Sequence, residues 1–355
     1  MYRKQEMQLT PFSDGQVANI FTLTNKQGSS ITVMDVGATW LSCKIKMQDE
    51  LREVLLGIDS MEKHLQQQVY LGATVGRYAN RIKHGKFEIN GQCFQTSINQ
   101  ADNTLHGGLE GFDKRRWQVV KQEKNKIIFS LLSKDGDQGF PGNLAVMVSY
   151  HFNDQNEVSI EYRANTDKTC PVNLTNHAYF NLLGAEKGQN CLTHRLQIKA
   201  DRYAPNDEKG IPLGSFPPVT GSSFDFVQEK VIKQDFLSDL QQQNQSGYDH
   251  SFLLNGDQDS RKVVLTLTAP DRSIQLAVST SKPALHLYTG NFLQGTPARG
   301  ERIYGCHAGI ALETQYLPDA PNNLQWSQPC PYLQPEQTYQ STTRYSFSVL
   351  SKDKK

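Results

Sequence analysis

The sequence lacks an excess of charge of either sign, because its 37 Lys and Arg residues are balanced by 36 Asp and Glu residues. A protein that binds nucleic acid gains affinity by neutralising phosphates with surplus basic groups, and this chain has no such surplus. The one basic cluster, Lys114 to Arg116, stands beside Trp117 and allows a nucleic-acid contact. Three charges are few, so a solvated loop is the favoured interpretation and no nucleic-acid partner is expected.

The sequence also lacks long apolar segments. No apolar stretch reaches the about 18 residues that a membrane-spanning helix needs. The N-terminal segment Met1 to Gln8 contains charged residues, but no apolar run of signal-peptide length follows it. These absences predict a cytoplasmic protein that does not bind membranes. No protein partner is indicated.

Signals for metals, disulfides and phosphates are missing as well. The sequence has no His-Glu-x-x-His motif and no glycine-rich phosphate loop. Its cysteines are far apart without a Cys-x-x-Cys pair, which predicts reduced thiols rather than a zinc cage or a disulfide scaffold. These cysteines are Cys43, Cys93, Cys170, Cys191, Cys306 and Cys330. We therefore expect no metal and no cofactor.

What the sequence does contain is apolar alternation at period two. Residues 145–152 and 158–164 alternate in this way around a polar loop, which predicts a β-hairpin. Asn90-Gly91 between two short alternating runs predicts a second hairpin, because this pair tolerates the positive φ angles of a tight turn. Residues 262–268 and 274–280 predict a third. Further strands are expected at residues 30–36, 126–133, 196–200, 284–288, 310–315 and 345–350.

Helical signals are few and short. Residues 60–68 begin with a serine suited to capping, and residues 233–242 carry apolar residues at helical spacing. Many short strands without alternating helices favour an all-β fold, a large β-sandwich with a few short helices. No linker or repeat marks a boundary, so residues 1–355 are expected to form a single domain. Residues 351–355 are expected to be a frayed tail.

Four polar segments are scattered among these strands: Gly76 to Ile82, Leu105 to Gly108, Thr175 to Leu182 and Leu312 to Asn322. In this order they resemble the aldose 1-epimerases, also called galactose mutarotases. The similarity extends through Gly111 to Trp117, Asp135 to Asn143, Gly247 to Phe252 and Tyr288 to Leu293. The resemblance implies a single-domain supersandwich that binds free hexoses such as glucose and galactose in a cleft across one sheet, and interconverts their α and β anomers without a cofactor.

The resemblance also implies which residues transfer protons. His177 matches the family's general acid and Glu313 its general base. The residues alone leave other interpretations open, since a lone His is often satisfied by a carbonyl and a Glu at a strand edge often faces solvent. Their ordinary pKa values, about 6.5 and about 4.3, suggest a protonated His177 near neutrality and an ionised Glu313. His106, in Leu-His-Gly-Gly, is expected beside the ring oxygen of the sugar.

The remaining matches predict substrate contacts. Asn80, Arg81 and Asp249 match sugar-binding residues of the family, and Tyr179 is expected to line the same cleft. Arg77 is interpreted as structural. His286 is also expected to contact the sugar, but it departs from the family, because it stands where many relatives have a Gln that contacts the substrate. An imidazole can donate or accept one hydrogen bond but cannot make both with the geometry of an amide, which leaves the preferred sugar open.

Two alternative functions stay open at the level of sequence. A non-catalytic sugar-binding sandwich would use similar Arg, Asp and aromatic groups, but it would need no paired Glu and His. A hexose-6-phosphate 1-epimerase would need extra cations at the cleft. Three tryptophans, Trp40, Trp117 and Trp326, could stack on a sugar, although packing in the core or at the rim is favoured for each.

Overall fold

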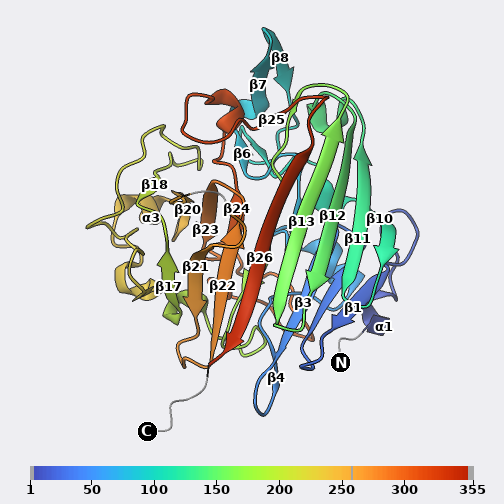
Figure 1. Cartoon of the computed structure of the whole chain (residues 1–355), viewed down its shortest axis with the longest axis vertical. Coiled ribbons are helices and arrows are strands. Elements are labelled where there is room, and N and C mark those ends of the chain that lie inside the picture. Colours follow the sequence, from blue (N-terminus) through green and yellow to red (C-terminus); the bar gives the residue numbers. More distant parts are fainter. Residues whose placement is uncertain (1–3, 257–258, 351–355) are drawn as a thin grey trace.

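The largest element of the fold is an antiparallel sheet of nine strands (Figure 1). The structure is a computed structural model that describes residues 4–256 and 259–350. In spatial order the strands are β10 (Gln118–Gln122), β11 (Lys126–Ser133), β12 (Leu144–Phe152), β13 (Glu157–Thr166), β26 (Tyr339–Val349), β22 (Ile274–Thr280), β21 (Val263–Thr268), β17 (Arg195–Ile198) and β19 (Lys230–Val231).

A second antiparallel sheet packs against the first. Its strands are β16 (Tyr179–Phe180), β24 (Ile310–Gln315), β23 (Ala284–Tyr288), β20 (Asp249–Leu253) and β18 (Arg202–Ala204). Leu312 on this sheet and Tyr345 on the large sheet belong to one apolar core. Thr314 and Thr343 hydrogen-bond between the two sheets at 2.5 Å. This layering confirms the predicted β-sandwich.

Smaller sheets complete the fold. A four-stranded sheet consists of β1 (Ile20–Thr24), β2 (Ser30–Met34), β3 (Thr39–Lys46) and β4 (Leu51–Glu53). The two-stranded pairs are β5 (Thr74–Val75) with β15 (Thr175–Asn176), β6 (Arg81–Ile82) with β9 (Thr104–Leu105), β7 (Lys86–Ile89) with β8 (Gln92–Gln95), and β14 (Cys170–Pro171) with β25 (Tyr332–Leu333).

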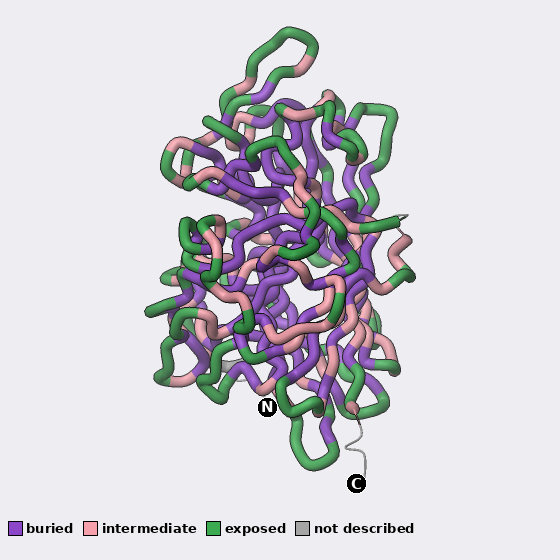
Figure 2. Tube along the Cα trace, turned by 90° about the vertical axis from the view of Figure 1, so that its left-hand side faces the viewer, coloured by how far each residue is buried: buried purple, intermediate pink, exposed green. Residues whose placement is uncertain are grey.

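Helices are short throughout. They are α1 (Lys4–Met7), α2 (Met61–Gln66) and α3 (Leu240–Asn244), with 3₁₀ turns at Lys83–Gly85, Phe112–Lys114, Asp137–Gly139, Cys191–Thr193, Ile232–Asp235 and Ala320–Asn322. Within residues 4–256 and 259–350, every helix is too short or too polar to serve as a transmembrane segment. Figure 2 shows buried segments through the middle of the molecule and exposed loops around its outline.

The three predicted hairpins are confirmed. β12 pairs with β13, β7 with β8, and β21 with β22. Asn90 and Gly91 have φ angles of 51° and 80°, as a two-residue primed turn requires. The strands expected at residues 126–133, 284–288 and 310–315 have the predicted bounds. The strand expected at residues 345–350 is longer than predicted, because β26 already begins at Tyr339.

The predicted helices have different outcomes. Residues 61–66 form α2, and the hydroxyl of Ser60 accepts a hydrogen bond from the N–H of Lys63 as predicted for a cap. The single helix expected over residues 233–242 is wrong. Leu237 has a φ of 58°, which ends helical geometry there, and Asp239 caps the separate helix α3. The frayed tail predicted for residues 351–355 lies outside the described residues.

Several side chains with open interpretations prove to be structural. Trp40, Trp117 and Trp326 are all buried, and none lines the candidate site described below. In the basic cluster, Arg115 pairs with Asp137, and Arg116 pairs with Asp14 and with Asp35. These two arginines are therefore held by carboxylates rather than simply solvated.

Arg77 is buried and has the structural role that was predicted. Its guanidinium donates hydrogen bonds to carbonyl oxygens of Ser133, Lys134, Pro141 and Gly142 at 2.9–3.0 Å. This cation is thus satisfied by backbone dipoles, as a buried charge requires. It ties the loop before β6 to the loops at the end of β11 and the start of β12.

His194 is a buried histidine that the fold needs in its neutral form. Its Nε2 accepts the N–H of Leu182 at 2.9 Å, and its Nδ1 lies 3.0 Å from the carbonyl oxygen of Cys191. Nδ1 therefore carries the proton. Burial lowers the pKa of His194 to about 4. In the unfolded chain this histidine has a pKa of about 6.5, so between the two pKa values it is protonated in the unfolded state and neutral in the folded state.

We expect the free energy of unfolding to fall as the pH drops from 7 to 5, by about 2 kcal/mol from His194 alone. In His194→Gln this part of the loss should disappear, because an amide can make both hydrogen bonds but does not titrate. Urea denaturation at the two pH values measures the difference. His151→Gln, on the large sheet, is the matched control, and an equal pH dependence in all three proteins would contradict the prediction.

Candidate active site

The floor of the candidate site is one face of the five-stranded sheet. Alternation along β23 and β24 sends Leu287 and Leu312 into the core and turns His286 and Glu313 to the opposite face. The antiparallel register places Ser251, His286 and Glu313 in one row across β20, β23 and β24. The neighbouring row contains Asp249, Tyr288, Ala311 and Tyr179.

A second pair of strands supplies the wall of the site. Asn80 and Arg81 lie at the start of β6, and His106 follows β9, which pairs with β6. Asn80 and His106 both have left-handed backbones, with φ angles of 64° and 53°. Two hydrogen bonds join these residues: the main-chain N–H of His106 donates to the Asn80 carbonyl at 3.0 Å, and the main-chain N–H of Asn80 donates to the side-chain Nδ1 of His106 at 3.1 Å.

The hydrogen bond at Nδ1 determines the tautomer of His106. Because Nδ1 accepts a hydrogen bond, Nε2 must carry the ring hydrogen of the neutral imidazole, and a neutral His106 can therefore donate a hydrogen bond from that atom. Burial lowers the pKa of His106 well below its usual range, and the nearby charge of Arg81 acts in the same direction. His106 is thus arranged as a neutral hydrogen-bond donor.

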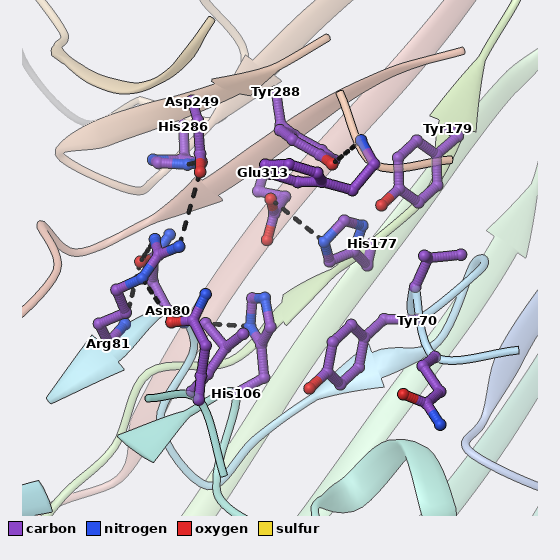
Figure 3. Close-up of a pocket in the computed structure, with 15 residues that line it drawn as sticks. Tyr70, Asn80, Arg81, His106, His177, Tyr179, Asp249, His286, Tyr288 and Glu313 are labelled. Carbon is purple, nitrogen blue, oxygen red and sulfur yellow. Dashed lines mark hydrogen bonds and ion pairs between the residues drawn. The ribbon is translucent and has the colours of Figure 1, made fainter. Parts of the chain in front are cut away.

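His177 and Glu313 form the centre of the site (Figure 3). Nε2 of His177 lies 3.5 Å from Oε1 of Glu313, and the two residues are only 4% and 1% exposed. Nδ1 of His177 and Oε2 of Glu313 have no hydrogen-bond partner among the described residues. A solvent-facing Glu313, one of the open interpretations, is therefore excluded.

Burial sets the protonation of this pair. It lowers the pKa of His177 to about 3 and raises the pKa of Glu313 well above its usual range, because neither charge is well solvated there. These directions are opposite to the expectation of a protonated His177 and an ionised Glu313, which rested on their ordinary pKa values. Burial thus disfavours the charged form of both groups.

Asp249 and Arg81 form the charged side of the site. Arg81 Nη2 lies 3.6 Å from Asp249 Oδ2, and Arg81 Nε donates to Gln100 Oε1 at 2.8 Å. Burial alone would raise the pKa of Asp249, but the charge of Arg81 and the hydrogen bond from His286 lower it below its usual range. Asp249 is therefore ionised and can accept hydrogen bonds from a ligand.

The structure brings all eight predicted site residues together in one pocket. They are Asn80, Arg81, His106, His177, Tyr179, Asp249, His286 and Glu313. The ring of Tyr179 stacks on that of His177 with centroids 4.8 Å apart. Residues from six separate stretches of the chain thus converge, which sequence spacing alone could not place.

Sequence reasoning missed Tyr70. Its ring lies 4.6 Å from that of His106 and 5.8 Å from that of His177. The backbone of Tyr70 is left-handed, with a φ of 58°, and Oε1 of Gln67 accepts the N–H groups of Val69 and Leu71 on either side of it. This loop belongs to none of the recognised motifs, so no local signal identified it.

Tyr288 and Phe292 also line the pocket, although their segment carried no assigned role. Tyr288 accepts the N–H of Phe292 at its hydroxyl oxygen, at 2.9 Å. Phe292 is 62% exposed, which is high for an aromatic ring at a pocket. The segment Tyr288 to Leu293 is one of the stretches that resemble the family, and this resemblance is the only sequence signal for the two residues.

The nitrogens of His106 and His177 and an oxygen of Glu313 lie within 4.8 Å of one another, close enough to consider a metal ion. A histidine that binds a metal normally donates its other N–H to an acceptor. His106 instead accepts a hydrogen bond at Nδ1, and Nδ1 of His177 has no acceptor among the described residues. This arrangement suits proton transfer better than metal binding.

Comparisons with known proteins agree with the geometry. A family model described as aldose 1-epimerase matches residues 19–346. The chain is 49% identical over 335 residues to a protein of Escherichia coli (strain K12) named aldose 1-epimerase, covering 94% of this chain and 96% of the relative. It is 39% identical over 321 residues to galactose mutarotase of Homo sapiens, covering 90% and 91% of the two chains.

Solved structures have the same fold. An aldose epimerase homologue from C. elegans has a TM-score of 0.85 at 29% identity, covering 94% of this chain and 100% of that one. A galactose 1-epimerase from Lactobacillus acidophilus has a TM-score of 0.82 at 29% identity, covering 96% and 97%. The similarity therefore extends over nearly all of each chain.

From the tautomers we predict that the purified protein carries no stoichiometric transition metal. Dialysis against EDTA should also leave its thermal unfolding temperature unchanged, since no ligand set is lost. Plasma mass spectrometry and calorimetry measure these two quantities. One bound metal per chain that disappears in His177→Asn would contradict the prediction.

Proposed function

The chain belongs to the aldose 1-epimerase family, and we propose that His177 and Glu313 are the acid and the base with which it interconverts the α and β anomers of hexoses. The protein is an isomerase. The observation that carries the assignment of roles is the buried pair itself, with Nε2 of His177 and Oε1 of Glu313 3.5 Å apart in a pocket. Two such groups suffice for a reaction that only moves protons.

The reaction opens and recloses a cyclic hemiacetal. The carboxylate of Glu313 takes the proton from the hydroxyl on carbon 1, and a carbonyl forms there. The bond between carbon 1 and the ring oxygen breaks as that oxygen takes a proton from His177. Rotation about the bond between carbons 1 and 2 exposes the other face of the carbonyl. Both protons then return, and the ring closes as the opposite anomer.

The reaction needs charges that burial disfavours, since burial favours the neutral forms of both Glu313 and His177. Sugar hydroxyls that donate to the unpartnered Oε2 would stabilise the carboxylate, and the charge of Arg81 acts in the same sense. The bound sugar thus favours an ionised Glu313 beside a protonated His177, the state from which the reaction starts.

The surrounding residues hold the sugar in this proposal. Nε2 of His106 donates to the ring oxygen, because its Nδ1 is occupied by the N–H of Asn80. Arg81 and Asp249 bind hydroxyls with a donor and an acceptor that already face one another. Tyr179 covers His177 with its ring. Such an arranged set of partners lowers the cost of orienting the substrate.

The two alternative functions have less support. Among the described residues that line the pocket, Arg81 is the only Lys or Arg, and Asp249 already lies beside it. The pocket would lack the additional cations that the phosphate group of a hexose 6-phosphate requires. A simple sugar-binding module would have no use for a buried His177 and Glu313 pair, which costs stability unless it has a function.

A free aldohexose is therefore the proposed substrate, with no cofactor. We also propose a cytoplasmic location, a single domain and the absence of a protein partner. The core supports the single domain, since one apolar cluster includes residues from Leu23 to Phe347. Following the optical rotation of pure α-glucose after adding the protein tests the activity directly. Comparing glucose, galactose and glucose 6-phosphate tests the substrate class.

Glu313→Gln should nearly abolish mutarotation, with a loss of about 10²–10⁴-fold in kcat, the usual effect of removing a general base. The fold should survive, because Gln resembles the protonated carboxyl that burial already favours. Polarimetry measures the rate and thermal unfolding checks the fold. Exposed Glu301→Gln is the control, and a correctly folded Glu313→Gln protein with near-normal kcat would refute the assignment.

His177→Asn should reduce kcat about as strongly as Glu313→Gln, because the leaving ring oxygen loses its acid. His106→Asn should be milder, since His106 is arranged as a neutral donor that only supports that oxygen. Steady-state rates of the two variants give the order. If His106→Asn were the slower enzyme, the two roles would have to be exchanged.

A further inference from the structure

We propose that His286 is a positioning residue that holds Asp249 in place, and that it does not contact the sugar itself. The inference rests on the proposed function, because it concerns how the same pocket binds its substrate. It differs from the expectation that His286 takes over the substrate contact of a glutamine.

The hydrogen bonds of His286 carry this inference. Its Nε2 lies 2.6 Å from Asp249 Oδ1, and its Nδ1 lies 2.9 Å from Ser251 Oγ. An imidazole has only these two polar atoms, so both are used within the protein. His286 is 2% exposed, which leaves little of the ring for a ligand.

The roles of donor and acceptor follow from the charge of Asp249. An ionised carboxylate can only accept, so Nε2 of His286 must donate to it. The hydrogen bonds therefore link Ser251 through His286 to Asp249, and His286 donates the bond to the carboxylate.

These hydrogen bonds determine which carboxylate oxygen of Asp249 remains available to the sugar. Oδ1 is held by His286, whereas Oδ2 lies 3.6 Å from Arg81, a distance that still leaves room for another donor. The carboxylate is thus fixed before the sugar arrives, with Oδ2 and Arg81 side by side in the pocket (Figure 3). Prearranged partners of this kind raise affinity because less order is lost on binding.

The sheet register makes the arrangement possible. Ser251 lies directly opposite His286 on the neighbouring strand, and Asp249 is two residues along β20 on the same face. The imidazole of His286 can therefore contact the side chains of Ser251 and Asp249 at the same time. A glutamine at position 286 could make a similar bridge, since its amide nitrogen can donate to Asp249 while its oxygen accepts from Ser251.

Steady-state kinetics on α-glucose test the proposal. His286→Leu removes both hydrogen bonds, and KM should rise on the order of 10-fold, as expected for losing a hydrogen bond to a charged group, while kcat falls less. His286→Gln should recover most of the lost affinity. Ser251→Ala is a smaller change, so it keeps the proposal testable if the His286→Leu variant misfolds. It should also raise KM, but by a smaller factor than His286→Leu.

The decisive measurement combines His286→Leu with Asp249→Ala. If His286 acts only through Asp249, the double variant should have the same KM as Asp249→Ala alone. If His286→Leu raises KM as much in the Asp249→Ala protein as in the wild type, His286 contacts the sugar and the proposal is overturned. His151→Gln controls for histidine replacement in general. A wild-type protein without mutarotation would instead refute the proposed function, whatever KM does.

Discussion

The register between β23 and β24 is the constraint on which the rest of the site depends. It places His286 opposite Glu313 on one face while Leu287 and Leu312 enter the core on the other. Because the side-chain period of a strand is two, a slip of one residue would exchange these faces. The leucines would then lie in the pocket and the titratable groups in an apolar core. Packing of the two sheets therefore fixes the chemistry of the site.

Burial gives the site its chemical character. His177 and Glu313 pack where water cannot solvate a charge well, so each pKa moves toward the neutral form. The charged pair of Arg81 and Asp249 is different, because each stabilises the other. The site thus combines a buried pair in which charge is disfavoured with a second pair that is charged.

The loops that carry functional groups are held by structural residues outside the pocket. Arg77, three residues before Asn80, bonds to carbonyl groups of two distant loops. Asn173 accepts the N–H of Ala79 at its carbonyl oxygen, and its side-chain oxygen accepts the N–H of Tyr316, which follows Glu313 closely. These contacts join the wall of the pocket to its floor. The geometry of the site is therefore a property of the whole sandwich.

The sequence by itself determined the features that depend on neighbouring residues: strands with period two, the Asn90-Gly91 turn, the cap at Ser60, and the motifs from which an acid, a base and sugar contacts are predicted. It could not show that Leu237 interrupts a helical pattern, that Tyr70 packs on both histidines, or that both nitrogens of His286 are occupied. The effect of burial on the pKa of His177 and on that of Glu313 also came only from the structure. Hydrogen-bond partners and solvation depend on residues that are far apart in the chain, and only the tertiary structure brings those residues together.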